Sequence, residues 1–535
     1  MKTLFFCLLA MAAVPCIAQT VAPDTPTLTI GPKIKGLQFD WEPVARASWY
    51  QLEIKANERT QFAQVADDID ASITTLSYRF PLHLYFWTPA RYRLAACNSA
   101  GCTRSAEVPV SNLRRFAVGY FKPARTLTGQ RFAADTDISG DGVNFVSAAP
   151  GESIAASGGG RPGGAIYAFR RIGGVWTQRA RLEPTIPPFI EGSNEMKVAI
   201  SDNGQTIVLG MPNYFHQQFD VQSGEAFVFR WNGSIYVRTR IIAGSRGHFG
   251  RWVAINDAGD TIAIAHGDHS NPSLPPGVFI YKLVNGAWQP VRGLANKAGR
   301  AEICGHGVLS GDGSTVAETC EEAAVGTTPA RYYVRTHSGP NWTKRVDVPL
   351  QMSVSSARYG HGGIAIDGTG NTIAAQIFVP DDGPAEVQVF EREEGVHYEK
   401  EATLKPGAWR ANARRGFFGQ SLALSSNGAV LAVGDPWDNG LGEGPRAAPL
   451  NPGASPTGAV YVYRYYDDWW TLYNMVKPNY HPANAPYLTF GSDVELNTDG
   501  IALMVGEGGE SSGARGIAGA WANLNAPGSG AVWLY

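Results

Sequence analysis

A hairpin signature repeated seven times between residues 138 and 500 constrains the fold of this chain more than any other feature. Each copy has an apolar residue, three small or polar residues, and a final Gly. The copies are Ile138-Ser-Gly-Asp-Gly142, Ile200-Ser-Asp-Asn-Gly204, Ile255-Asn-Asp-Ala-Gly259, Leu309-Ser-Gly-Asp-Gly313, Ile366-Asp-Gly-Thr-Gly370, Leu424-Ser-Ser-Asn-Gly428 and Leu496-Asn-Thr-Asp-Gly500. The final glycines are separated by 62, 55, 54, 57, 58 and 72 residues. A unit of this length holds about four strands with their loops, which predicts a seven-bladed β-propeller over residues 113–535.

The strands expected within each unit differ in their polarity. The segments before and after the hairpin turn are apolar almost throughout, as in Thr261-Ile-Ala-Ile-Ala265, so we expect neighbouring blades to cover both of their faces. A third strand such as Gly458-Ala-Val-Tyr-Val-Tyr463 alternates, and a more polar fourth strand carries one aromatic residue, for example Trp470. The final Gly of each turn is expected to adopt a positive φ.

The phase of the repeat leaves the last unit without its fourth strand. The chain ends at Gly530-Ala-Val-Trp-Leu-Tyr535, which has the pattern of a third strand. Residues 118–127 precede the first unit and have the pattern of a fourth strand. We therefore expect this early segment to complete the last blade and close the ring, which removes two exposed sheet edges.

The N-terminal part of the chain has a different organisation. Residues 1–18 combine a basic start, an apolar run too short to span a bilayer and small residues before Ala18, as in a signal peptide. Residues 23–112 contain alternating segments such as Leu37–Trp41 and Trp49–Ile54, which predict a small β-sandwich. The sequence thus predicts a mature protein that is secreted, periplasmic or on the cell surface.

Four cysteines remain after the signal peptide, and they allow three pairings. Cys97 and Cys102 flank a four-residue turn, whereas Cys304 and Cys320 are symmetric about Asp312 in a hairpin turn. Residues equidistant from a hairpin centre face each other at a separation suited to a disulfide. We expect bridges Cys97–Cys102 and Cys304–Cys320, with buried free thiols as the alternative.

Two families resemble parts of the chain. Trp41, Tyr92 and the run Asn98–Gly101 match the core and late hairpin of a fibronectin type III domain. The aromatic-Gly pairs such as Phe418-Gly419, the Asp/Asn-Gly turns, and the Gly-Ala-Val-Tyr strand resemble the FG-GAP repeats of integrin α-chain propellers. This resemblance implies adhesion-like roles and, in some blades, calcium in Asp-rich loops. The acidic run Asp135-Thr-Asp-Ile-Ser-Gly-Asp141 departs from the full calcium-loop pattern, so an ordinary turn is favoured and no cofactor is expected.

The sequence offers few groups that indicate catalysis. The formal charge of −2 and the lack of a basic stripe argue against a nucleic-acid partner, and no later segment is apolar enough to span a membrane. The run His266-Gly-Asp268-His269 is the most ligand-like cluster, but its spacing matches no specific metal site. Trp437 and Asp438 lie in one of the two longest loops, 437–457, and Trp521 lies in the other, 507–529. In a propeller such loops gather on one face, where an exposed Trp can stack on a sugar or anchor a protein, although it can also only pack the loop.

We therefore expect an extracellular interaction or adhesion-like protein that binds a protein or a glycan through propeller loops. The alternative is a secreted polysaccharide hydrolase or lyase with its active site on the propeller axis. Convergence of two or more carboxylates, or of a His/Asp set, in an axial pocket would favour the enzyme.

Overall fold

The computed structural model describes residues 21–84, 89–152, 163–184, 195–213, 215–216, 221–222, 224–241, 247–266, 277–295, 302–322, 330–351, 362–377, 385–393, 395, 397–406, 417–445, 447, 456–479, 489–519 and 521–535. The predicted signal peptide lies outside these residues. Two compact units are present: the first comprises Met1–Tyr78 and Phe86–Arg114, and the second comprises Arg79–Tyr85 and Arg115–Tyr535. The described residues contain strands and two short 3₁₀ turns, Arg114–Phe116 and Pro340–Trp342, but no α-helix. No helix among them is long and apolar enough to cross a bilayer.

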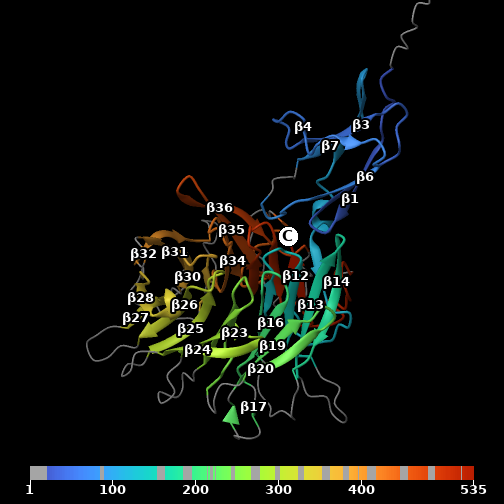
Figure 1. Cartoon of the computed structure of the whole chain (residues 1–535). Helices are drawn as coiled ribbons and strands as arrows, with labels where there is room; N and C mark the ends of the chain where they lie inside the picture. The colour runs from blue at the N-terminus through green and yellow to red at the C-terminus, as the bar shows by residue number, and fades with distance from the viewer. Residues whose placement is uncertain are drawn as a thin grey trace, which may run out of the picture. The chain divides into compact units, whose positions relative to one another are not determined.

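The first unit consists of two antiparallel sheets (Figure 1). One sheet has the order β1-β2-β6, and the other has the order β4-β3-β7-β8, with β5 paired to β3 and β9 to β7. The strands are β1 Leu28–Lys33, β2 Gly36–Trp41, β3 Trp49–Lys55, β4 Ala63–Gln64, β5 Ile69–Asp70, β6 Thr75–Arg79, β7 Arg91–Asn98, β8 Gly101–Arg104 and β9 Val108–Pro109. Aromatic contacts join the sheets' buried faces: Phe39 to Tyr92 at 5.0 Å and Trp41 to Tyr50 at 5.5 Å between ring centroids. Cys97 and Cys102 face each other in the β7–β8 pair, with an S–S distance of 2.06 Å.

The second unit is built from four-stranded antiparallel sheets, as expected for a propeller-like fold. Six sheets follow the chain order: β11 Thr136–Ile138, β12 Asn144–Ala149, β13 Ala165–Ile172 and β14 Val175–Leu182; β15 Lys197–Ile200, β16 Thr206–Met211, β19 Glu225–Trp231 and β20 Tyr236–Ile241; β21 Val253–Ile255, β22 Thr261–His266, β23 Gly277–Val284 and β24 Ala287–Ala295; β25 Glu302–Leu309, β26 Val316–Glu322, β27 Arg331–Ser338 and β28 Lys344–Pro349; β29 Ile364–Ile366, β30 Thr372–Ile377, β31 Glu386–Glu393 and β32 His397–Leu404; β33 Ser421–Leu424, β34 Val430–Asp435, β35 Ala459–Tyr466 and β36 Trp469–Val476. A further two-stranded ribbon pairs β17 Phe215–His216 with β18 Val221–Gln222.

One more four-stranded sheet joins the two ends of the second unit. It has the order β10-β39-β38-β37, with β37 Asp493–Leu496, β38 Leu503–Glu507, β39 Ala531–Leu534 and β10 Gly119–Phe121. Tyr120 lies opposite Trp533 in the β10–β39 pair, so the early segment supplies a fourth strand to the last sheet, as expected. The first strands of successive sheets contact one another, and β37 contacts β11, which completes a circle of first strands.

The seven turn glycines adopt the left-handed backbone that their sequence predicts, with φ between 63° and 74°. The hydroxyl of Ser139 donates to Asp141 at 2.5 Å, and Val143 N donates to the same carboxylate at 3.0 Å. Ser201 with Asn203 and Ser425 with Asn427 repeat this arrangement. The recurring side chains therefore fix the hairpin conformation that defines each repeat.

The expectation that the first strands are apolar on both faces was wrong. Asp137, Lys197, Asp493 and Glu495 belong to or begin these strands and are only partly buried. Their side chains line a cavity on the axis, where polar groups retain access to solvent.

Candidate axial ligand site

The cavity on the axis is formed by the first strands of all seven four-stranded sheets. Its volume is ≈ 320 Å³. Ala199, Ala254, Val308, Ala365, Ala423, Val494 and Thr136 are among the lining residues, one from each first strand. Because each first strand contributes only a few residues, the lining comes from segments spread over hundreds of positions in the sequence.

The hairpin turns converge at one end of the axis. Backbone hydrogen bonds join neighbouring turns in succession: Asp202 N to Asp257 O, Asp257 N to Gly311 O, Asp312 N to Gly368 O, Gly368 N to Ser426 O, Ser426 N to Thr498 O, and Thr498 N to Gly140 O. Small residues are required here, since a Cβ on Gly368 would lie 1.8 Å from the Ser426 hydroxyl oxygen. Access to the cavity is therefore expected from the opposite end, where the second-to-third-strand loops lie.

Acidic side chains occupy one sector of the cavity and link neighbouring sheets. Asp493 on β37 accepts hydrogen bonds from the Thr136 amide at 2.5 Å and the Thr136 hydroxyl at 2.6 Å. Asp135 accepts from Val198 N at 2.7 Å and Asp137 from Ile200 N at 2.6 Å. These carboxylates satisfy amides of the next first strand that the sheet's own ladder leaves unpaired, which is a structural use of the charges.

The same sector has strongly perturbed electrostatics. Burial, with the charge of Asp135 as a further cause, raises the pKa of Asp493 to about 7. Burial and neighbouring carboxylates also raise the pKa values of Asp137 and Glu495 well above their ordinary range. Lys197 Nζ lies 2.9 Å from Asp135, and this pairing raises its pKa despite the opposing effect of burial. One ammonium thus lies among several carboxyl groups, which is why burial and mutual repulsion raise the pKa values of three of them.

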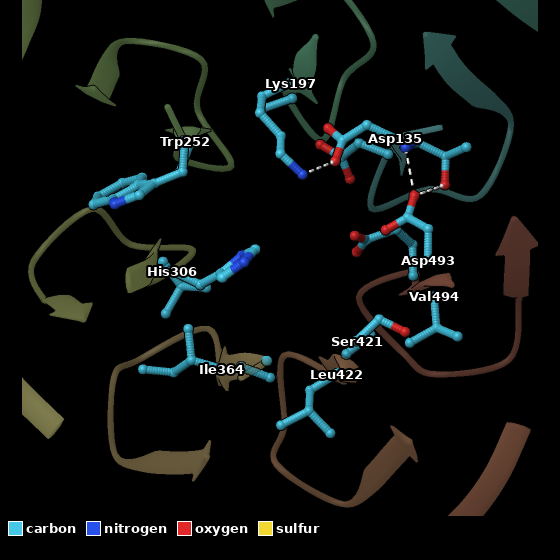
Figure 2. A pocket seen from close by; sticks show the side chains of 18 of the residues that line it. Asp135, Lys197, Trp252, His306, Ile364, Ser421, Leu422, Asp493 and Val494 are labelled. Carbon is cyan, nitrogen blue, oxygen red and sulfur yellow. Dashed lines mark hydrogen bonds and ion pairs between the residues drawn. The ribbon is translucent and has the colours of Figure 1, made fainter. Parts of the chain in front are cut away.

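His306 reaches the cavity from a β-bulge. In the β25–β26 pair, Cys304 faces Cys320 and Gly307 faces Glu318, so Gly305 and His306 together lie opposite Thr319 and one strand carries one extra residue. The Cys304–Cys320 disulfide (S–S 2.13 Å) and Arg251, which donates to the carbonyls of Cys304 and Gly305, hold the bulge. Figure 2 shows the imidazole of His306 directed into the cavity across from Asp135 and Asp493, with Ile364 and Leu422 on the apolar side. Bulges of this kind aim side chains at ligand sites.

The mouth of the cavity is polar and partly cationic. A neighbouring hollow of ≈ 450 Å³ shares Lys197, His306, Gln420 and Ser492 with the axial cavity and adds Arg131 and Thr489. Donors and acceptors of hydrogen bonds therefore surround the entrance, and Lys197 connects it to the carboxylate of Asp135.

An aromatic pair lies next to this mouth. Gln420 N donates to Phe417 O at 2.9 Å, so Phe417 belongs to the turn that carries Gln420. The indole of Trp437 stacks on Phe417, with ring centroids 5.3 Å apart and planes at 28°, and 42% of Trp437 remains exposed. Trp437 thus lies beside the mouth with part of its indole open to solvent.

The other predicted binding residues are placed differently. Asp438 is 1% exposed and forms a 2.5 Å ion pair with the buried Lys477, so it supports the loop and does not face a ligand. Trp521 makes an edge contact with Phe116 at 6.2 Å. His266 stacks on Phe279 at 4.7 Å, and burial lowers its pKa. Asp268 and His269 lie outside the described residues.

The described residues do not fit the metal sites considered from the sequence. Asp141 is used within its hairpin turn, whereas Asp135 and Asp137 point to the axis, so the three acids do not form a calcium loop. Within the described part of the chain, Glu302, Cys304 and Cys320 are the group with metal-ligand spacing, but the two sulfurs are joined in the disulfide.

Sequence reasoning missed most of the axial site. Lys197, His306, Asp493 and Glu495 were not singled out, although charges inside otherwise apolar first strands were a usable signal. The bulge that presents His306 was not predicted. The pairs next to the turn, such as Leu309 with Val316, are not symmetric about Asp312, and the extra residue of the bulge brings Cys304 opposite Cys320.

No family model matches the chain and no curated protein matches its sequence. Solved structures of low identity are similar to it in fold. A putative 6-phosphogluconolactonase from Bacteroides uniformis shares 11% identity over 81% of this chain and 98% of its own, with a TM-score of 0.41. TolB from Acinetobacter baumannii shares 9% over 73% and 76%, with a TM-score of 0.33, and the β-propeller domain of the trilobed protease from Pyrococcus furiosus shares 8% over 87% and 98%, with a TM-score of 0.34. The four-stranded sheets and the circle of first strands make the described chain β-propeller-like, and no activity or partner is argued from these similarities.

Proposed function

We propose that this chain is an extracytoplasmic binding protein: a seven-bladed, FG-GAP-like propeller preceded by a fibronectin type III-like module. The circle of contacts among the first strands and the β10–β39 pairing support the closed ring. The two-sheet arrangement and the positions of Trp41 and Tyr92 support the module. The disulfides Cys97–Cys102 and Cys304–Cys320 favour a secreted, periplasmic or surface location, because such bonds persist in oxidising compartments.

The ligand that suits the loop-bearing end of the propeller is a glycan. The observation that carries this proposal is the half-exposed Trp437–Phe417 stack beside a mouth lined by Arg131, His306 and Gln420. A flat aromatic face packs against the C–H face of a sugar ring, while nearby polar side chains bond its hydroxyl groups. An integrin-like adhesion role would follow if the glycan is carried by another cell.

Replacement of Trp437 by Ala tests this proposal. Because the side chain is partly exposed, W437A should fold like the parent protein yet bind its glycan at least about tenfold more weakly, which corresponds to about 1.4 kcal/mol. Binding of the mature protein to a glycan array, followed by calorimetry on the best ligand, gives the measurement. Equal affinity of W437A and the parent, or capture of protein partners alone, would contradict glycan recognition at this site.

A second candidate is a polysaccharide hydrolase or lyase, favoured by the convergence of Asp135, Asp493 and Glu495 in the axial cavity. In hydrolysis Asp493, whose pKa burial raises to about 7, would protonate the leaving glycosidic oxygen, while a neighbouring carboxylate takes a proton from the water that attacks the sugar carbon. This candidate comes second because Asp135 and Asp493 already accept hydrogen bonds from backbone amides, which is a structural use of both carboxylates. New reducing ends or unsaturated products released by the parent protein, and lost in E495Q, would establish it.

A further inference from the structure

The hairpin between β35 and β36 carries an exposed aromatic pair. Tyr466 and Trp469 face each other across the two strands and are 71% and 75% exposed. On the other face of the hairpin, Tyr465 contacts Trp470 at 5.5 Å, and Trp470 packs against the hydrophobic core. One face of the hairpin is therefore anchored while the other presents two large aromatic rings to solvent.

This hairpin lies at the opposite end of its sheet from Trp437. Tyr465 N donates to Ala429 O at 3.0 Å, next to the turn that ends at Gly428, whereas Trp437 follows the far end of β34. The pair Tyr466–Trp469 is thus separate from the axial mouth and its loops.

The turn of this hairpin differs from its counterparts in other sheets. The β13–β14 and β23–β24 hairpins turn through Gly173-Gly174 and Asn285-Gly286, which tolerate a left-handed backbone. Asp467 and Asp468 occupy the same positions here, with φ of 49° and 62°. Asp tolerates the left-handed backbone of such a turn, so this hairpin places two exposed carboxylates beside the aromatic pair where the other two hairpins carry no charge.

Polar side chains border the aromatic pair on the same face. Side chains two residues apart in a strand point to the same face. Arg464 therefore lies on the same face as Tyr466, and Thr471 lies on the same face as Trp469. Both are exposed, and the Arg464 guanidinium lies 5.1 Å from the Tyr473 ring centroid. The surface therefore combines flat aromatic faces with charged groups of both signs and a hydroxyl group.

We propose that this surface, formed by Tyr466 and Trp469 with Arg464, Asp467, Asp468 and Thr471, is a second glycan-binding site for a neutral polysaccharide chain. The rings stack on successive sugar units, and the carboxylates, guanidinium and hydroxyl bond their hydroxyl groups. One guanidinium and two carboxylates give the surface a net negative charge. Because this charge repels a polyanion, an uncharged polymer suits the surface better. This second site shares no residue with the axial mouth. A negative result for one site therefore leaves the proposal for the other unchanged.

Affinity electrophoresis of the mature protein in gels containing soluble β-glucan, xylan, galactomannan or pectin tests this inference. At least one neutral polymer should retard the parent protein, and both W469A and the Y466A/W469A variant should lose most of that retardation. The matched control is V175A on the equivalent β13–β14 hairpin, where Val175 is 63% exposed; it should migrate like the parent. W437A should keep the retardation caused by this site.

Three outcomes would overturn the inference. They are unchanged retardation of Y466A/W469A, no retardation of the parent by any of the neutral polymers, and retardation that is lost in D467N/D468N but kept in W469A. The last outcome would mean that the carboxylates of Asp467 and Asp468 bind the polymer without stacking on the aromatic rings. Thermal unfolding curves that superimpose for all variants, as expected for exposed positions, separate loss of binding from loss of folding.

Discussion

At the scale of single residues, axial acids link neighbouring sheets through backbone amides, and this placement raises the pKa of some of them. Asp493 shows this most directly, because its carboxylate serves Thr136 on the neighbouring sheet while its pKa rises from an ordinary value of 3.8 to about 7. A group whose pKa is higher in the folded than in the unfolded protein stabilises the fold at low pH. That contribution is lost as pH rises from about 4 through about 7, since the folded protein must then ionise a buried acid.

Replacement of Asp493 by Asn should remove this part of the pH dependence. The amide oxygen can still accept from Thr136, but the side chain no longer ionises. We expect the melting temperature of the parent protein to fall more steeply than that of D493N between pH 5 and pH 8, measured by circular dichroism. Asp257, with a pKa raised to about 6 by burial, keeps its effect in both proteins and cancels in the comparison. Parallel curves would show that Asp493 is ionised throughout this range.

At the scale of elements, a buried acid–base pair recurs near the loop that follows the second strand of several sheets. Glu152 pairs with Arg181 at 2.6 Å, Asp438 with Lys477 at 2.5 Å, and Glu510 with Lys122 at 2.5 Å. In the first two cases a third-strand tyrosine also donates to the acid, Tyr167 at 2.6 Å and Tyr461 at 2.8 Å. Each pair joins a loop to the fourth strand of its sheet or to the residues next to that strand. In the last sheet the fourth strand is β10, and Lys122 directly follows it. The pairs therefore fix the start of loops that carry candidate binding residues such as Trp437.

Breaking one such pair should destabilise the second unit strongly. In D438N the Lys477 ammonium would stay buried without its counter-charge, and loss of one partner of a buried pair costs about 3–5 kcal/mol. Urea unfolding of D438N should therefore show a clearly lower midpoint than that of the parent protein. D468N, an acid in an exposed turn, should unfold like the parent and serves as the control. A midpoint for D438N equal to that of D468N would show that the pair contributes little.

The repeat made the elements predictable, whereas the site was predictable only in part. Turn glycines, strand pairing within each hairpin and the Cys97–Cys102 pair follow from local patterns, whereas the register that joins Cys304 to Cys320 also depends on the bulge. Asp438 illustrates the limit: its neighbour Trp437 is half-exposed, yet Asp438 itself is buried against a lysine thirty-nine positions away, and no local pattern distinguishes the two. The axial residues come from seven separate strands, so their convergence depends on ring geometry and bulges that spacing does not encode.

At the scale of the whole second unit, the closure of the ring depends on how β10 packs against both the last and the first sheets. Phe121 is fully buried and belongs to the last sheet by pairing with Val532. Its ring nevertheless contacts Phe145 at 5.0 Å and Trp176 at 5.4 Å, which belong to the first sheet. The Phe121 side chain therefore packs the last sheet against the first sheet at the junction that closes the ring.

Truncation of Phe121 to Ala should consequently weaken both sheets that meet at this junction. A buried Phe→Ala change costs about 3–5 kcal/mol through lost contacts and the cavity that remains. Hydrogen exchange measured by mass spectrometry should increase in β37–β39 and β11–β14 together, because opening the ring exposes the facing surfaces of both sheets. F116A, which removes an aromatic ring that is 47% exposed just before β10, should leave the exchange pattern unchanged. If faster exchange in F121A were confined to β10 itself, the ring would be stable without this contact, and closure would rest on backbone pairing between Gly119–Phe121 and Val532–Leu534 alone.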